Sequence, residues 1–443
     1  MPAELMESMR VMAGLASPLL QRVLLLLAIG ALARSSAGAC DATRMRIGTS
    51  VGGMQPRAID STQRRPRVTP FRQVEGKSWV SLGLSNLAIV ALVSDPSSPS
   101  TLYAAGGEPG TLAREVWKST DAGGTWSPAD AGLEGVTVSV LAIDPTTPRV
   151  LYAGASFGAS SASVYKTIDG GLHWAAAGAG LPPMTVNALA VDPNSSSTIY
   201  AGTTDSLAGG AVFRSLNGGS SWAEVDGLPN ASVSKLVVTP TTPAIVYAAT
   251  VAGAFKRVGD AGAWLRLDIA SSPVAVSALG TEASSPTTLY AGTPSVVEEE
   301  CVTRSGGLFR SSDGGASWME VGDGLPNINP IAIAVDESQP GVVYVAAQRF
   351  ECGRHVPDAV LGTTNAGVSW TLANRGLPDA FVFTLAIGQS SSTTLYAGTS
   401  EGVFAITFAG IPPPSAQVLE AGPSRPASIS PVPPRPPFSA TCW

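Results

Sequence analysis

Apolar and polar positions along the chain repeat with a spacing of 43 to 54 residues. Each repeat opens on a short apolar run, and the best copies, residues 141–145 and 189–193, end at an Asp-Pro pair. A run that is apolar throughout is typical of a β-strand buried on both faces. A Leu-Tyr-Ala-like segment follows, and its tyrosine occurs seven times: Tyr103, Tyr152, Tyr200, Tyr247, Tyr290, Tyr344 and Tyr396. The pattern therefore predicts a repeated β structure with seven units.

A third segment of each repeat centres on a large apolar residue, and a glycine-rich turn then leads to a tryptophan. The third-segment position holds Trp117, Tyr165, Phe213, Phe255, Phe309, Leu361 and Phe404. The tryptophans are Trp79, Trp126, Trp174, Trp222, Trp264, Trp318 and Trp370. Four short antiparallel strands per repeat form one blade of a propeller. The sequence therefore predicts an all-β fold, a seven-bladed β-propeller of four-stranded antiparallel blades.

The turn before the tryptophan follows a fixed motif, Ser/Thr-x-Asp-x-Gly-x-x-Trp. The five good copies consist of Ser119, Asp121, Gly123 and Trp126; Thr167, Asp169, Gly171 and Trp174; Ser215, Asn217, Gly219 and Trp222; Ser311, Asp313, Gly315 and Trp318; and Thr363, Asn365, Gly367 and Trp370. A decayed sixth copy at residues 257–264 keeps the spacing and the tryptophan. The acidic or amide side chain can accept backbone N–H groups of the turn, and the glycine supplies a positive φ. The motif is thus predicted to close the hairpin between the third and fourth strands.

This motif is the Asp box, also called the BNR repeat, and the chain resembles Asp-box propellers over three quarters of its length. That superfamily includes sialidases, xyloglucan-type endoglucanases, sortilin-type receptors and the photosystem II assembly factors of the Ycf48/Hcf136 type. The resemblance implies that the Asp boxes are structural and lie on the face away from the ligand site. Asp121, Asp169 and Asp313 are therefore expected to be turn residues and not catalytic groups.

Ring closure follows from counting the motifs. Six Asp boxes accompany seven tyrosine strands, and residues 402–408 form the last third strand before the chain becomes rich in proline. Residues 78–84, around Trp79, resemble residues 221–228, around Trp222. We therefore expect the N-terminal strand to complete the seventh blade, which leaves no open sheet edge.

The segments on either side of the ring differ from it in composition. Residues 1–39 have an apolar run half as long as a membrane span and a small-residue site before Cys40, which is typical of a signal peptide. Residues 40–76 are expected to be a linker, 77–410 the propeller and 411–443 a proline-rich disordered tail. The chain is thus predicted to be secreted or placed in the cell envelope or periplasm, without a membrane span. Cys40 is a possible site for a lipid anchor.

Charge and residue usage narrow the chemistry. Residues 77–410 hold 15 Lys and Arg against 27 Asp and Glu, which argues against nucleic acid as a partner. The two histidines, His173 and His355, lack partners at metal-ligand spacing, so neither a metal nor another cofactor is expected. The ring is expected to be a monomer.

Catalysis would require groups that the sequence supplies weakly. A sialidase-like site needs three arginines for the substrate carboxylate, and glycoside hydrolysis needs two carboxyl groups at a defined separation. Loops between second and third strands contain eight acidic residues: Glu108, Asp205, Glu298, Glu299, Glu300, Glu351, Asp358 and Glu401. These loops are expected on the face opposite the Asp boxes. Their acidic side chains form either a solvated rim or a pair of catalytic carboxylates.

Two of these loops, in blades five and six, are long and contain Cys301 and Cys352. Adjacent blades place such loops side by side, and an exported protein meets oxidising conditions, so the two cysteines are predicted to form a disulfide. The loops also hold the densest polar cluster of the ring: Glu298, Glu299, Glu300, Arg304, Arg349, Glu351, Arg354 and His355. We interpret this cluster as the ligand or partner site. The predicted function is a non-catalytic interaction module for a protein or glycan, and the alternative is a carbohydrate-active enzyme, sialidase-like or another glycoside hydrolase.

Overall fold

A computed structural model describes ten segments of the chain: residues 77–111, 114–156, 163–204, 209–269, 274–298, 301–304, 306–322, 328–351, 354–389 and 393–408. The expected signal peptide, linker and tail lie outside these segments. In the described segments no helix is long and apolar enough to cross a bilayer.

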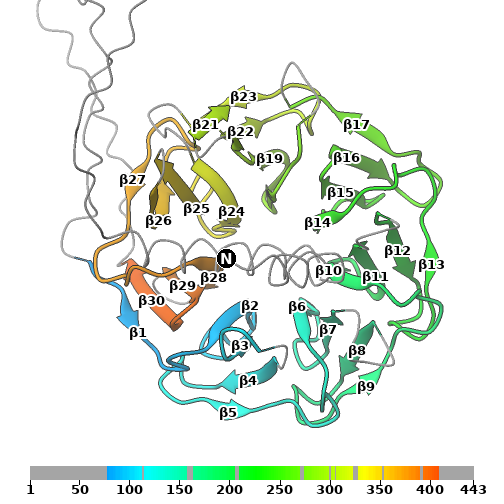
Figure 1. Cartoon of the computed structure of the whole chain (residues 1–443). Coiled ribbons are helices and arrows are strands. Elements are labelled where there is room, and N and C mark those ends of the chain that lie inside the picture. The colour runs from blue at the N-terminus through cyan, green and yellow to red at the C-terminus, as the bar shows by residue number, and fades with distance from the viewer. Residues whose placement is uncertain are drawn as a thin grey trace, which may run out of the picture. The chain divides into compact units, whose positions relative to one another are not determined.

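Seven four-stranded antiparallel sheets are arranged as the blades of a ring (Figure 1). Blade 1 consists of β2 (Ala88–Ser94), β3 (Leu102–Gly107), β4 (Glu115–Ser119) and β5 (Ser127–Pro128). Blade 2 consists of β6 (Val138–Ile143), β7 (Leu151–Ala155), β8 (Val164–Thr167) and β9 (Ala175–Ala176). Blade 3 consists of β10 (Thr185–Asp192), β11 (Ser195–Thr204), β12 (Val212–Ser215) and β13 (Ala223–Glu224).

The remaining blades repeat this order from the centre outwards. Blade 4 consists of β14 (Val233–Val238), β15 (Ile245–Thr250), β16 (Gly253–Val258) and β17 (Leu265–Leu267). Blade 5 consists of β18 (Ala278–Glu282), β19 (Ser285–Thr293), β22 (Gly307–Ser311) and β23 (Met319–Glu320), with an added hairpin of β20 (Val296–Glu298) and β21 (Cys301–Arg304). Blade 6 consists of β24 (Ile328–Val335), β25 (Val343–Glu351), β26 (Arg354–Thr363) and β27 (Thr371–Leu372). Blade 7 consists of β28 (Val382–Gln389), β29 (Thr393–Thr399), β30 (Gly402–Phe408) and β1 (Val80–Ser81).

Hydrophobic cores lie between neighbouring blades. Between blades 1 and 2, Tyr103 and Val116 pack with Leu141, Leu151 and Trp174. All seven repeated tyrosines are buried, with exposed fractions of 0% to 4%. Because each blade buries both faces against its neighbours, the second strand must be apolar on both sides, which explains the recurring Leu-Tyr-Ala pattern.

The ring closes as the sequence predicts. Strand β1 pairs antiparallel with β30, with Val80 opposite Ala405 and Ser81 opposite Phe404. The buried Trp79 next to β1 donates its backbone N–H to Arg375 O at 2.8 Å. Closure by the N-terminal strand is confirmed, and the last blade therefore contains strands from both ends of the described chain.

Each intact Asp-box turn is held by hydrogen bonds of the same kind. In blade 1 the Ser119 hydroxyl donates to Asp121 Oδ1 at 2.7 Å and accepts the Gly123 N–H at 2.8 Å. Asp121 Oδ1 also accepts the Thr125 N–H at 2.8 Å. Gly123 has a φ of +90°, and a Cβ there would come within 2.5 Å of a Leu82 methyl group. The turn therefore requires glycine both for its backbone angle and for its contact with the closing segment.

The other four intact boxes repeat the bond between the glycine and the hydroxyl. Each glycine has a φ of +89° or +90° and donates its N–H to the Ser or Thr hydroxyl at 2.8 to 3.1 Å. These glycines are Gly171, Gly219, Gly315 and Gly367.

Two of the boxes hold an amide where the motif has its acid. Asn217 Oδ1 accepts the Ser221 N–H at 2.9 Å, as Asp121 Oδ1 accepts the Thr125 N–H. Asn365 Oδ1 accepts the Ser369 N–H at the same distance of 2.9 Å. The amide oxygen makes the same backbone contact as the carboxylate, so the turn forms without a negative charge in these two blades.

The tryptophans after the Asp boxes connect blade to blade. Trp174 Nε1 donates to Ala129 O at 2.8 Å, and Trp222 Nε1 donates to Ala177 O at 2.7 Å. Each acceptor is the third residue after the preceding blade's tryptophan, and Trp79, Trp126 and Trp370 follow the same rule. These five bonds link neighbouring blades along the outer edge of the ring, and the series is interrupted at Trp264 and Trp318 in blades 4 and 5.

Candidate functional site

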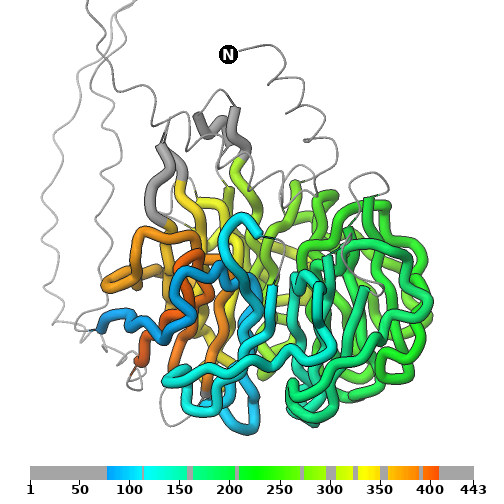
Figure 2. The backbone as a smooth tube through the Cα atoms, turned by 60° about the horizontal axis from the view of Figure 1, so that its bottom comes forward, coloured from blue at the N-terminus to red at the C-terminus, as the bar shows by residue number. Residues whose placement is uncertain are grey.

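The two faces of the ring carry different connections. In a four-stranded antiparallel blade, successive turns alternate between the two ends of the strands. The Asp-box turns therefore share one face with the turns between first and second strands. The connections between second and third strands and between blades lie on the other face, which we call the loop face. Blades 5 and 6 (yellow-green to yellow) rise at the upper edge of the ring in Figure 2.

The predicted ligand residues lie on two hairpins of the loop face. In blade 5, Glu298 pairs with Cys301 in the β20–β21 hairpin, and Arg304 ends its second strand. In blade 6, Glu351 pairs with Arg354 at the tip of the β25–β26 hairpin. Strand β21 contacts β25. The backbone thus brings the two halves of the predicted cluster next to each other.

Two further residues of the predicted cluster lie on the blade 6 hairpin. Arg349 pairs with Val356 and is half-buried, and His355 pairs with Phe350. Glu299, Glu300 and Cys352 lie outside the described residues, so the Cys301–Cys352 disulfide stays a prediction. The length of the two loops and their polar residues were the basis for proposing this cluster. Neither feature indicated that the blade 5 loop forms a separate two-stranded sheet.

Asp358, which the sequence places in an acidic rim, has a different role. Its side chain is 2% exposed, on β26 of blade 6. Its Oδ2 accepts the N–H of Val382, the first residue of β28 in blade 7, at 2.9 Å. Burial raises the pKa of this carboxyl to about 7, and the Val382 hydrogen bond opposes the rise. Asp358 therefore joins two blades beneath the loop face.

A cation that the sequence analysis missed lies on an inner strand. Lys235 is on β14, the inner strand of blade 4, and follows a bulge at Ser234 (Figure 1). Its side chain is exposed, and an exposed side chain on the innermost strand faces the central channel. Surrounding protein lowers the pKa of this ammonium by desolvation. Among the seven inner strands, Lys235 is the single Lys or Arg. The signal was present in the sequence as a lysine inside a mostly apolar first strand.

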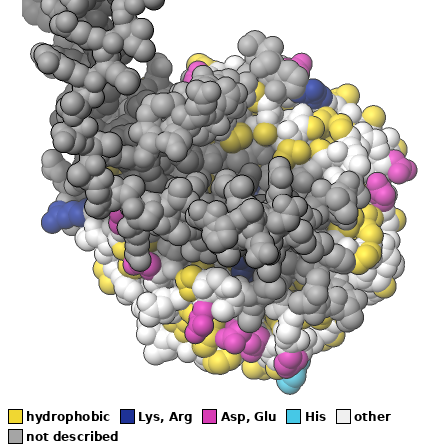
Figure 3. Space-filling model, viewed as in Figure 1, with side chains coloured by type: hydrophobic (Ala, Val, Ile, Leu, Met, Phe, Trp, Pro, Cys, Tyr) yellow, Lys and Arg dark blue, Asp and Glu magenta, His cyan; other side chains and the backbone are white. Residues whose placement is uncertain are grey.

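The charges of the described surface are mostly acidic. Acidic side chains lie around the rim of the face seen in Figure 3, with few basic ones between them. Across the described segments, no group of three or more His, Cys, Asp and Glu side chains is placed to hold a metal ion. His173 contacts Asp169 at 2.8 Å within its own Asp box, on the opposite face.

Solved structures share this architecture. An ancestral GH74 enzyme has 17% sequence identity to this chain and a TM-score of 0.56, over 73% of this chain and 45% of that one. YCF48 from Cyanidioschyzon merolae has 13% identity and a TM-score of 0.52, over 74% of this chain and 98% of that one. YCF48 bound to D1 peptide has 12% identity and a TM-score of 0.53, over 76% and 99%. The chain is a seven-bladed propeller similar to GH74 enzymes and YCF48.

These similarities establish the fold. Identities of 12% to 17% do not carry a function across. The chain spans 45% to 64% of the length of the GH74 enzymes that it matches. No protein-family model and no curated protein matches the sequence.

Proposed function

We propose that this chain is an exported, non-catalytic binding module that holds a protein or glycan ligand on the two hairpins of blades 5 and 6. The observation that carries the proposal is the contact between β21 and β25, which joins an added hairpin to the end of a blade. The five intact Asp-box motifs are engaged in hydrogen bonds within their own turns. They offer the ligand little free chemistry, whereas the hairpins carry charges of both signs.

The Cys301–Cys352 disulfide is part of this proposal. Cys301 is the first residue of β21, and Cys352 follows Glu351, the last residue of β25. Strand β21, which begins at Cys301, contacts β25, which ends one residue before Cys352 in the sequence. A bond between them would fix the hairpins and reduce the entropy lost on ligand binding. Peptide mapping of the non-reduced protein should find the two residues linked, and two free thiols would contradict this part.

A peptide ligand has a structural precedent in the same fold. A YCF48 structure with a TM-score of 0.53 to this chain contains a D1 peptide. Sheet hairpins that extend beyond a blade can bind an extended peptide through backbone hydrogen bonds and select it through side-chain charges. We therefore favour an extended peptide as the first ligand class to test, with glycans next.

The test selects ligands on the full-length protein from a phage-displayed peptide library and from a glycan array. A double variant with Glu298→Ala and Arg354→Ala should bind the selected ligands with at least tenfold lower affinity. Charged contacts at a binding surface contribute about 1–3 kcal/mol to the free energy of binding. The matched control combines Glu224→Ala and Arg266→Ala, which removes one exposed charge of each sign from the outer strands β13 and β17. Equal affinity of the double variant and the control would contradict the proposal.

Hydrolysis is the competing outcome. Fluorogenic sialosides and β-glucan oligosaccharides should give no turnover with the full-length protein. Turnover that a single substitution of a loop-face carboxylate abolishes would replace the binding module with a glycoside hydrolase.

A further inference from the structure

Three blades hold a lysine in the same way. Lys118 Nζ lies over the Tyr103 ring, 5.2 Å from its centroid, and donates to Gly170 O in the next blade at 3.0 Å. Lys166 does the same with Tyr152 and Gly218 O, at 5.4 Å and 2.9 Å. Lys256 repeats it with Tyr247 and Gly314 O, at 5.8 Å and 3.0 Å. A tyrosine face and the carbonyl after an Asp-box acid or amide thus form a recurring ammonium site.

In each case the lysine is on the third strand, directly opposite the second-strand tyrosine. The pairs are Tyr103–Lys118, Tyr152–Lys166 and Tyr247–Lys256, with Tyr200–Arg214 and Tyr290–Arg310 as the arginine versions. In blade 6, Tyr344 pairs with Gly362, and the ring of Phe408 stacks on it at 5.2 Å. In blade 7, Tyr396 pairs with Ala405.

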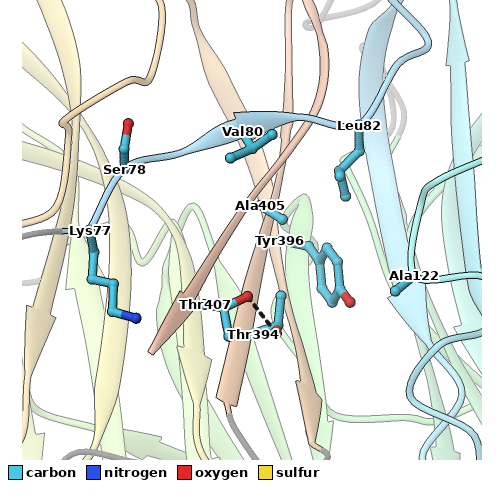
Figure 4. A pocket seen from close by; sticks show the side chains of 9 residues that line it. All are labelled: Lys77, Ser78, Val80, Leu82, Ala122, Thr394, Tyr396, Ala405 and Thr407. Atoms are coloured by element: carbon cyan, nitrogen blue, oxygen red, sulfur yellow. Dashed lines mark hydrogen bonds between the residues drawn. The ribbon is translucent and has the colours of Figure 1, made fainter. Parts of the chain in front are cut away.

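A pocket of about 420 Å³ opens at this point, where blade 7 meets blade 1 (Figure 4). It is lined by Lys77, Ser78, Val80, Leu82, Ala122, Thr394, Tyr396, Ala405 and Thr407. Tyr396 supplies the ring of the recurring site. Ala122 also lines the pocket and follows Asp121 as Gly170 follows Asp169, so its carbonyl is the counterpart of the Gly170 acceptor.

The turn at Ala122 has the geometry of the turns that accept a lysine. Its φ is +57°, against +75° at Gly170. Its N–H donates to Ser100 O at 2.7 Å, as the Gly170 N–H donates to Arg149 O at 2.9 Å. Hydrogen bonds within the turn lower the pKa of Asp121 to about 2, so a carboxylate stands beside the carbonyl at neutral pH. The seam therefore has the tyrosine ring and a turn equivalent to the one that supplies the acceptor, and Ala405 stands where the other blades have the lysine.

We propose that this seam pocket, formed by Tyr396, Ala405 and the Ala122 carbonyl, binds a primary alkylammonium group such as a lysine side chain of an extended peptide. The ammonium takes the position that Lys118, Lys166 and Lys256 occupy in their blades, and its alkyl chain runs past Ala405 and Thr407. Lys77 lies across the pocket from Tyr396, beyond Thr394 and Thr407 in Figure 4, and its like charge weakens the site. The site is separate from the hairpins of blades 5 and 6, because it lies at the joint of blades 7 and 1.

The probe is Nα-acetyl-lysine methylamide, titrated into the full-length protein and followed by NMR. One cation–π contact and one charge-assisted hydrogen bond predict a Kd on the order of 1 mM. The Nε-acetylated probe, which is neutral, should bind at least tenfold more weakly. Equal binding of the two probes would overturn the proposal.

Ala405→Lys is the decisive variant, because it rebuilds the lysine of the other blades inside the pocket. It should keep or raise the melting temperature and reduce probe binding at least tenfold. Gly362→Lys is its matched control at the seam of blades 6 and 7, where a Cβ would already meet the Tyr344 ring at 3.2 Å. That variant should lower the melting temperature and leave probe affinity unchanged. Unchanged probe binding by Ala405→Lys would overturn the proposal.

Two further variants separate the ammonium site from a general packing effect. Tyr396→Phe keeps the ring and should keep the Kd within about threefold. Lys77→Gln removes a like charge and should tighten probe binding severalfold, with the gain shrinking as salt screens the charges. Weaker binding by Lys77→Gln would show that the pocket prefers an anion and would overturn the proposal.

Discussion

Ser119 shows how one small side chain holds an Asp-box turn. It is 2% exposed, donates to Asp121 and accepts the buried N–H of Gly123. Ser119→Ala leaves that N–H without its acceptor, so the free energy of unfolding should fall by about 1–3 kcal/mol. Urea denaturation measures the loss. The control Thr120→Ala, at the exposed neighbouring position, should change it by less than about 0.5 kcal/mol, and equal losses would contradict the assigned role.

Asp358 gives the ring a pH-dependent contact between blades 6 and 7. Its carboxyl has a pKa of about 7 in the folded chain, against 3.8 ordinarily, so the folded state retains a proton that the unfolded state loses. The stability from this group is fully present below about pH 4 and is lost as the pH rises through about 7. Asp358→Asn removes this dependence. The free energy of unfolding of the variant minus that of the wild type should rise by at most about 4 kcal/mol between pH 4 and 8. A difference that does not change with pH would contradict the buried, protonated carboxyl.

Sequence reasoning fails at Asp358 and Lys235 for the same physical reason. Position in a repeat predicts which strand a residue joins, but not whether its side chain meets a neighbouring blade or the channel. Asp358 lies one residue before the apolar part of β26, and only the approach of Val382 from blade 7 shows that its carboxyl is buried. The spacing of residues within one repeat does not predict the contacts that its side chains make with the next repeat.

At the scale of elements, the fourth strands are short and depend on their tryptophans. Five tryptophans donate to the preceding blade, but within the described residues the Trp264 indole N–H has no hydrogen-bond partner. Trp318 donates instead to Gly315 O in its own turn, at 3.2 Å. Both exceptions adjoin the decayed Asp box of blade 4, whereas Trp79 and Trp126 keep the regular bond although blade 7 has no Asp box.

This difference in hydrogen bonding predicts that Trp→Phe substitutions lower the free energy of unfolding by unequal amounts in different blades. Trp174→Phe leaves the Ala129 carbonyl without its donor and should lower the free energy of unfolding by about 1–3 kcal/mol more than Trp264→Phe does. Both side chains are buried and both keep an aromatic ring, so the comparison isolates the hydrogen bond. Equal losses in urea denaturation would show that packing alone sets the cost.

The elements themselves were predictable because seven copies repeat each position. The tyrosine strand, the third strand, the Asp-box turn and the tryptophan all occur where the pattern places them, and β30 covers the expected residues 402–408. The β20–β21 hairpin occurs in one blade and has no second copy to reveal it. The repeated positions therefore predict the architecture, whereas the candidate sites lie where one blade differs from the others.

At the scale of the molecule, the ring depends on the segment around β1. Trp79 is buried, and its indole N–H donates to Ala373 O in blade 6. Trp79→Ala should lower the free energy of unfolding by about 3–5 kcal/mol, and a chain that starts after residue 85 should lose more, because an open sheet edge then replaces β1. The control Val80→Ala, at a position 61% exposed, should cost less than about 1 kcal/mol. A truncated chain as stable as the full one would contradict closure by β1.

The candidate sites lie on separate parts of the ring. The hairpins of blades 5 and 6 form the proposed ligand surface, the seam of blades 7 and 1 forms the ammonium pocket, and the Asp-box turns hold the opposite face together. We propose that the ligand binds these hairpins and not the Asp-box face.

Hydrogen–deuterium exchange with a peptide or glycan selected on the full-length protein tests that claim most directly. We predict slower exchange on ligand addition in peptides that cover residues 296–304 and 343–358, with no change at residues 119–126 and 167–174 in the Asp-box turns. Slower exchange at the Asp-box turns, with the hairpins unchanged, would contradict it.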